Sequence, residues 1–287
     1  MFLSLQLAMN DYLVFAFLIF AGALSAGLLG ALSGLGGGVI IVPLLTLVFH
    51  VDIHYAIGAS LIAVIATSTG AASAFVKEGY SNIRIAMFLE MATTLGAIVG
   101  AFVAKDLSPS TIAIIFGCML IYSSIASLTE PKFPAEYKMS KLAARLNMNG
   151  SYPTADGPKE YKVYNIFGGF SVMTVAGVLS GLLGIGSGAV KVLAMDKIMK
   201  IPFKVSTATS NFMIGVTAAA SAGIYLHRGY IDPAISMSVM LGALAGSMIG
   251  ARYMVKVKVK SLRYIFSVII LALAAEMIYN GLTHKFG

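Results

Sequence analysis

Long apolar segments follow one another along most of this chain, and they constrain its fold more than any other feature. The longest cover residues 12–33, 55–76, 84–104, 108–128, 163–183, 203–226, 234–254 and 260–281. A helix that crosses the hydrocarbon core of a bilayer needs about 20 mainly apolar residues. The segments therefore predict an all-α fold, a polytopic bundle of transmembrane helices.

The composition supports this class of protein. Hydrophobic residues make up 58% of the chain and charged residues only 11%, whereas a soluble domain carries about 25% charged residues. The formal net charge of +8 is typical of a membrane protein whose cytoplasmic loops are rich in Lys and Arg. We therefore expect a multi-pass protein in the lipid bilayer of the cell membrane, with no nucleic-acid partner.

The two halves of the chain repeat each other at a fixed offset of 150 residues. The offset pairs Gly34–Gly38 with Gly184–Gly188, Ser60 with Ser210, Thr67 with Thr217, Gly79-Tyr80 with Gly229-Tyr230, Gly96 with Gly246, and Gly100-Ala101 with Gly250-Ala251. These matches include glycines and a Gly-Tyr turn, which similar hydrophobicity alone does not explain. They indicate an internal duplication, a common design among transporters.

A short apolar piece follows the glycine-rich stretch of each repeat, at residues 38–50 and 188–199. A dozen helical residues rise only about 18 Å, too little to cross about 30 Å of hydrocarbon. Each piece is therefore predicted to be one half of a glycine-broken, re-entrant hairpin.

The expected organisation is an N-terminal transmembrane repeat (1–129), a cytoplasmic linker (130–162) and a C-terminal transmembrane repeat (163–287). The linker is basic and contains four prolines, so it is placed inside the cell as a solvated segment. Alternatively, residues 139–146 form a short amphipathic helix on the membrane surface. With the linker inside, equivalent turns of the two repeats fall on opposite faces of the membrane, which makes them inverted-topology repeats.

The two glycine breaks predict a binding site for an anion. Broken backbone at membrane depth is tolerated only where it lines a cavity or is buried in protein. The half-helix that follows a break offers free N–H groups and a partial positive charge. Inverted symmetry would bring both breaks together near the midplane. The candidate substrate-binding residues are Gly36, Gly37, Gly38, Ser60, Gly186, Ser187, Gly188, Lys191, Ser210 and Asn211.

Each of these residues also has a purely structural interpretation. Glycines allow close helix packing, which fits Ala92/Gly96/Gly100 and Gly242/Gly246/Gly250 better than it fits the breaks. Serine and threonine hydroxyls bond back to their own helix or join neighbouring helices. For Ser60 and Ser210 both interpretations stay open.

Two charged residues within the apolar segments have alternative roles as well. Lys191 either faces the substrate or extends to the inner membrane surface, where Lys197 and Lys200 follow closely. Its counterpart in the first repeat is Ile41. Glu90 either carries a coupled proton or forms a salt bridge.

Five stretches of the sequence resemble one family of membrane permeases. They are SGLGGGVIIVPLL (33–45), GASLIAV (58–64), SGLLGIGSG (180–188), VSTATSNFMIGVTAAASAGIYL (205–226) and RGYIDP (228–233). Together they are similar to the sulfite exporter TauE/SafE family, which implies movement of small sulfur-containing anions such as sulfite or sulfonates. The second repeat departs from the family pattern: Ser187 replaces a glycine, Lys191 an apolar residue and Leu193 a proline.

The function expected is a secondary transporter that moves a small sulfur-containing oxyanion by alternating access, with one repeat rocking against the other. The alternatives are an anion channel and a cation or metal transporter that uses Glu90 and the His50–His54 turn. The sequence shows no nucleophile–base pair and no phosphate-binding loop. We therefore expect no enzyme, no catalytic residue, no metal site and no cofactor. The expected partner is the small anionic substrate, and a homodimer is left open.

Overall fold

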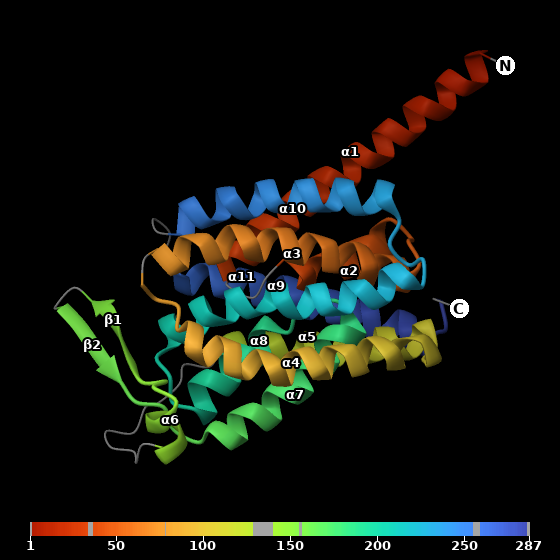
Figure 1. Ribbon diagram of the computed structural model, residues 1–287. Coiled ribbons are helices and arrows are strands. Elements are labelled where there is room, and N and C mark those ends of the chain that lie inside the picture. Colours follow the sequence, from red (N-terminus) through yellow and green to blue (C-terminus); the bar gives the residue numbers. More distant parts are fainter. Residues whose placement is uncertain are drawn as a thin grey trace.

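The computed structural model is a bundle of helices with a small appendage at one end (Figure 1). It describes residues 2–33, 37–77, 79–128, 140–154, 157–254 and 259–285. The first half contains α1 (Phe2–Ser33), α2 (Gly38–Pro43), the π-helical turn η1 (Leu44–Val48), α3 (Ile53–Lys77), α4 (Ile83–Val103), the 3₁₀ turn η2 (Ala104–Asp106) and α5 (Pro109–Leu128). The connecting region contains α6 (Lys141–Arg145), β1 (Gly150–Thr154) and β2 (Gly157–Tyr161). The second half contains α7 (Ile166–Leu183), α8 (Gly188–Leu193), the π-helical turn η3 (Ala194–Ile198), α9 (Phe203–His227), α10 (Pro233–Met254) and α11 (Val259–Leu282).

Five of the described helices are long and apolar enough to cross a membrane, which confirms a polytopic helical protein. Their apolar stretches are Leu13–Ala31, Ile53–Gly70, Ile83–Asp106, Ile166–Leu183 and Pro233–Gly250. Shorter apolar helices cover Gly38–Val48, Pro109–Ile125 and Ser267–Leu282. The predicted span in α9 is not among the five, and its first half carries a run of hydroxyl and amide side chains from Ser206 to Asn211.

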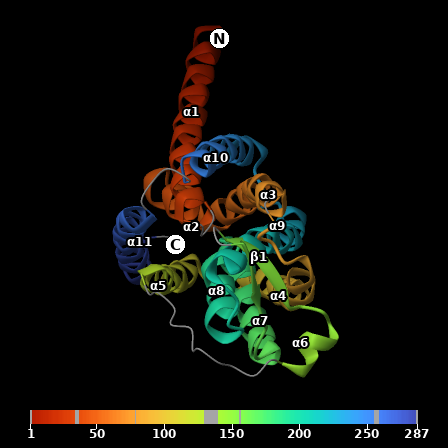
Figure 2. The ribbon, with the colours of Figure 1, turned by 90° about the vertical axis from the view of Figure 1, so that its left-hand side faces the viewer.

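The helices pack in pairs, and each of the closest pairs joins the two halves of the chain. The pairs are α1 with α10, α4 with α7, α3 with α9, and α5 with α11, as the view along the bundle shows (Figure 2). The short helices α2 and α8 pack against these long helices, and every residue of α2 is buried. The two halves are therefore interleaved within one bundle.

Glycines bring two of these pairs into close contact. A Cβ atom at Gly96 or Gly100 of α4 would overlap the carbonyl oxygens of Thr174 and Val178 on α7. The corresponding glycines of α10, Gly242, Gly246 and Gly250, lie in the same way against carbonyl oxygens of α1. The predicted packing role of both glycine series is confirmed.

The connecting region differs from a solvated linker. β1 and β2 form an antiparallel hairpin in which Gly150 pairs with Tyr161, so the fold is not purely α-helical. Ala143, Met148 and Val163 are buried in an apolar cluster with the start of α4. The helix predicted over 139–146 is shorter, at Lys141–Arg145, and residue 139 lies outside the described residues. Apolar side chains spaced along the linker hold it against the end of the bundle.

Two glycine-to-alanine substitutions should change stability in opposite directions. A Cβ atom at Gly177 of α7 would overlap the backbone of Thr93 on α4, whereas one at Gly223 of α9 meets nothing within 4 Å. Gly177→Ala should lower the free energy of unfolding by about 1–3 kcal/mol through overpacking. Gly223→Ala should raise it by up to about 1 kcal/mol, because alanine favours the helix. Thermal melting of the purified variants measures both effects, and shifts in the same direction would contradict the packing described here.

Candidate functional site

The second glycine break is a sharp, buried turn between α7 and α8. Gly184, Gly186 and Ser187 have positive φ angles of 68°, 69° and 50°. The Gly184 N–H donates to the Ser180 carbonyl at 2.8 Å, a left-handed cap that ends α7. Ser187 is the residue before α8 and has the left-handed conformation that favours glycine. Such local strain is typical of functional sites.

The breaks of the two halves lie against each other. Ser60 of α3 is fully buried, and its Oγ donates a hydrogen bond of 2.8 Å to the Gly184 carbonyl. A Cβ atom on Gly38 would lie 3.0 Å from Ser60 Oγ and 3.2 Å from the Gly184 oxygen. Gly37 and Gly38 are both buried, and Gly36 lies outside the described residues. The structure therefore brings Gly38, Ser60 and the second break together.

The predicted serines hold the broken backbone in place. Ser210 Oγ donates to the Gly188 carbonyl at 3.3 Å, just as Ser60 Oγ donates to the Gly184 carbonyl. The phenol of Tyr225 adds a third such bond, at 3.4 Å to the Leu182 carbonyl. The hydroxyl hydrogens of Ser60 and Ser210 thus serve the protein's own backbone in this structure. Asn211 follows Ser210 on α9 and is buried.

Lys191 is fully buried in a polar cluster with Thr217 and Glu90. Its exposed fraction is 0%, so it does not extend to the membrane surface. Lys191 Nζ donates to Thr217 Oγ1 at 2.5 Å and lies 4.0 Å from Glu90 Oε2. Thr217 Oγ1 in turn donates to Glu90 Oε1 at 2.6 Å. Glu90 is therefore in the salt bridge that was its structural alternative.

Several buried polar atoms near these residues have no hydrogen-bond partner among the described residues. They are Ser180 Oγ, Ser187 Oγ and Glu90 Oε2. Native proteins leave few such atoms, and each one calls for an explanation such as a bound ion or water. Two of the three flank the second break, and the third belongs to the charge pair.

Sequence reasoning did not assign a role to Thr217 or to the threonines around Glu90. Thr94 Oγ1 donates to Glu90 Oε1 at 3.2 Å, and Thr93 Oγ1 lies 3.4 Å from Thr217 Oγ1. The spacing of Glu90 and Thr94, four residues apart on one helix face, was the available signal. The pairing with Thr217 depends on tertiary packing and has no local signal.

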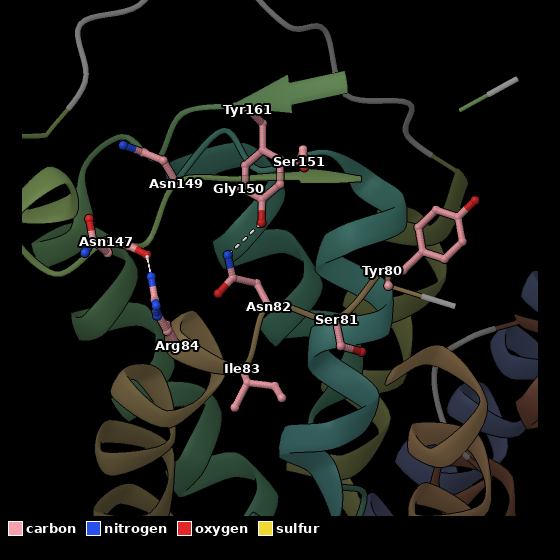
Figure 3. A pocket seen from close by; sticks show the side chains of 11 residues that line it. Tyr80, Ser81, Asn82, Ile83, Arg84, Asn147, Asn149, Gly150, Ser151 and Tyr161 are labelled. Carbon is pink, nitrogen blue, oxygen red and sulfur yellow. Dashed lines mark hydrogen bonds between the residues drawn. The ribbon is translucent and has the colours of Figure 1, made fainter. Parts of the chain in front are cut away.

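A separate pocket of about 300 Å³ lies where the connecting region covers the turn between α3 and α4 (Figure 3). Asn82 is central to it: its Nδ2 donates to the Met148 carbonyl at 2.9 Å and to the Tyr161 phenol at 2.7 Å. Arg84 Nη1 donates to the Asn147 carbonyl at 3.0 Å. Burial raises the pKa of Tyr161 and the hydrogen bond from Asn82 opposes this rise, so the phenol is neutral at pH 7. The pocket was missed because the linker was expected to be solvated.

Matching contacts join the halves at the two ends of the bundle. At one end, Lys204 Nζ lies 5.9 Å from the centre of the Tyr80 ring. At the other end, the rings of His54 and Tyr230 stack at 5.0 Å. The turn between α3 and α4 and the turn between α9 and α10 lie at opposite ends (Figure 1). The two pairs are related by the 150-residue offset, because His54 corresponds to Lys204 and Tyr80 corresponds to Tyr230.

The sequence matches one family along most of its length. The family described as "Sulfite exporter TauE/SafE" matches residues 18–277. The relatives are named as transporters. "Probable membrane transporter protein YunE" of Bacillus subtilis is 29% identical over 93% of this chain and 98% of its own length.

"Probable membrane transporter protein YdhB" of the same organism is 27% identical over 82% of this chain and 90% of its own length. "Probable membrane transporter protein MJ0441" of Methanocaldococcus jannaschii is 24% identical over 93% and 96%. No solved structure shows a significant match. The chain, a multi-pass membrane protein, belongs to the sulfite exporter TauE/SafE family.

Proposed function

We propose that this protein is a secondary transporter that moves a small sulfur-containing oxyanion across the cell membrane by alternating access. The observation that carries the proposal is the ammonium group of Lys191, fully buried one turn after a glycine break. A buried cation at this depth marks a substrate or ion pathway by default. Membership of a family of membrane transporters supplies the rest of the argument.

In this proposal the anion binds beside the second break. Lys191 supplies the charge, and Ser187 Oγ, buried without a partner among the described residues, supplies a hydroxyl donor. Gly186 and Gly188 let the backbone approach the ligand closely. Ser60 and Ser210 keep the breaks together, and Asn211 stays a candidate contact. A cation would meet the Lys191 ammonium here, and the described residues hold no group of three metal-ligating side chains.

The matching contacts at the two ends support inverted repeats and two gates. The Tyr80–Lys204 pair lies at the end that carries the basic connecting region, so it forms the inner gate. The Tyr230–His54 pair forms the outer gate. Because each of the four closest helix pairs joins the two halves, we do not propose that the repeats rock as separate units. Instead, these four helix pairs are the rigid bodies that move relative to one another.

Sulfur oxyanions should stabilise the purified protein against heat. The panel is sulfite, thiosulfate, sulfoacetate, sulfate, phosphate and chloride at fixed ionic strength. A ligand at 100 times its dissociation constant adds about 2.7 kcal/mol to the free energy of unfolding. We expect at least one sulfur anion to raise the melting temperature and chloride not to.

A matched pair of variants tests the role of Lys191. Removing Lys191 alone leaves Glu90 buried and unpaired, which costs about 3–5 kcal/mol. The double variant Lys191→Met/Glu90→Gln removes both charges and should fold, but should lose the anion effect. Lys197→Ala, an exposed lysine nearby, should keep it. An anion effect that survives in the double variant would contradict the proposed site.

The two gates should open to opposite sides when their aromatic rings are removed. The reporter is Ser187→Cys in a Cys118→Ser background, labelled by a membrane-impermeant thiol reagent from each face of oriented vesicles. Tyr80→Ala removes the Lys204 contact and should speed labelling from the side of the connecting region. Tyr230→Ala removes the His54 contact and should speed labelling from the other side. Equal effects of both variants on both faces would exclude this arrangement of gates.

A further inference from the structure

The interior charge pair joins the two halves, and it is present at only one of the two places that the 150-residue repeat relates. At the 150-residue offset, Lys191 corresponds to Ile41, Glu90 to Met240 and Thr217 to Thr67. Thr67 Oγ1 only bonds back to the Val64 carbonyl of its own helix, at 3.2 Å. The duplication therefore offers the position twice, and only one copy carries an ion pair. Close packing does not require the pair, since the other copy fills the same place with apolar side chains.

One oxygen of the Glu90 carboxylate accepts hydrogen bonds, and the other accepts none from the described residues. Oε1 accepts from Thr217 and Thr94. Oε2 has no hydrogen-bond partner among the described residues, and Lys191 Nζ is 4.0 Å away. A proton can therefore add to Oε2 without breaking any hydrogen bond in this structure.

Thr217 has a second acceptor in place for its hydroxyl hydrogen. Its Oγ1 lies 2.6 Å from Glu90 Oε1 and 3.0 Å from the Met213 carbonyl of its own helix. One hydrogen serves only one of these acceptors at a time. While Glu90 is charged, the short bond to the carboxylate is the stronger. Once Glu90 is neutral, the hydroxyl can turn to Met213 and stop holding the carboxyl beside Lys191.

The surroundings of Glu90 contain few other ionisable groups. The helix α7, packed against α4, carries none. On α9 the ionisable side chains, Lys204, Tyr225 and His227, lie near the two ends. On α4 itself the other one is Arg84, which bonds the Asn147 carbonyl at the edge of the pocket, and η2 adds Lys105 and Asp106 at the far end. Lys191 is thus the charge that Glu90 faces.

We propose that the substrate anion replaces the Glu90 carboxylate as the counter-ion of Lys191, and that Glu90 takes up one proton as it is released. This inference rests on the proposed function, because it assumes that the anion binds Lys191. The proton comes from the water on the side from which the anion enters, and it adds to Oε2. The interior then holds one ammonium, one anion and a neutral carboxylic acid. Each anion is transported with one proton, and Thr217 is the positioning residue that switches between the two states.

Titration calorimetry of the full chain in nanodiscs tests this exchange. The probes are thiosulfate and sulfoacetate, which keep their charge between about pH 6 and 8.5. Two buffers with different ionisation enthalpies report the protons taken up on binding. We expect the wild type to take up close to one proton per anion at the alkaline end. Its affinity should fall by up to about tenfold per pH unit there.

Three variants separate the roles of the residues. Glu90→Gln should take up no proton, lose the pH dependence and bind more tightly than the wild type at pH 8.5. Thr217→Val should shift the pH dependence, because the carboxylate loses its short hydrogen bond, and Thr217→Ser should restore it. The matched changes at the positions related by the 150-residue repeat, Met240→Gln and Thr67→Val, should leave proton uptake unchanged.

The outcomes distinguish this inference from the proposed function. Binding that needs Lys191 but takes up no proton, with Glu90→Gln behaving like the wild type, overturns the exchange and leaves the transporter proposal standing. Failure of both probes to bind the wild type at any pH overturns both. Proton uptake that persists in Glu90→Gln assigns the proton to another group and also overturns the exchange.

Discussion

Backbone that leaves a helix inside an apolar bundle must find hydrogen-bond partners within the protein, and the arrangement at the glycine breaks follows from that requirement. Hydroxyl groups meet it in the second break: Ser60 bonds the Gly184 carbonyl, Ser210 the Gly188 carbonyl and Tyr225 the Leu182 carbonyl. Since Ser60 belongs to the first half, this satisfaction of the backbone also ties the two halves together. The glycines at the breaks allow the backbones to approach closely enough for these bonds.

The charge pair is a second constraint, and in our proposal it serves function rather than folding. A buried ion pair gives little net stability, because desolvation offsets the attraction between the charges. The positions that the 150-residue repeat relates to this pair hold Ile41 and Met240 instead. The Lys191–Glu90 pair therefore fits a role in which the charges are exchanged with a ligand better than a role as structural support.

Much of this fold could be predicted from the sequence, because helix length, hydrophobicity and the 150-residue repeat are local or periodic signals. The starts of α2 and α8 after the glycine breaks, and the packing role of Gly96 and Gly100, were predicted correctly. The β-hairpin was not, since its apolar residues are few and scattered. At the site, Lys191 and Glu90 could be picked out as charges in apolar segments. Their pairing through Thr217 joins α8, α4 and α9, and no sequence pattern encodes that contact.

In our proposal Lys191 exchanges one counter-ion for another, and a density map of the protein in nanodiscs with thiosulfate tests that exchange. We expect density for the anion in contact with Lys191 Nζ, with the Glu90 carboxyl moved away from it. An unchanged Lys191–Glu90 pair with the anion bound elsewhere would contradict it.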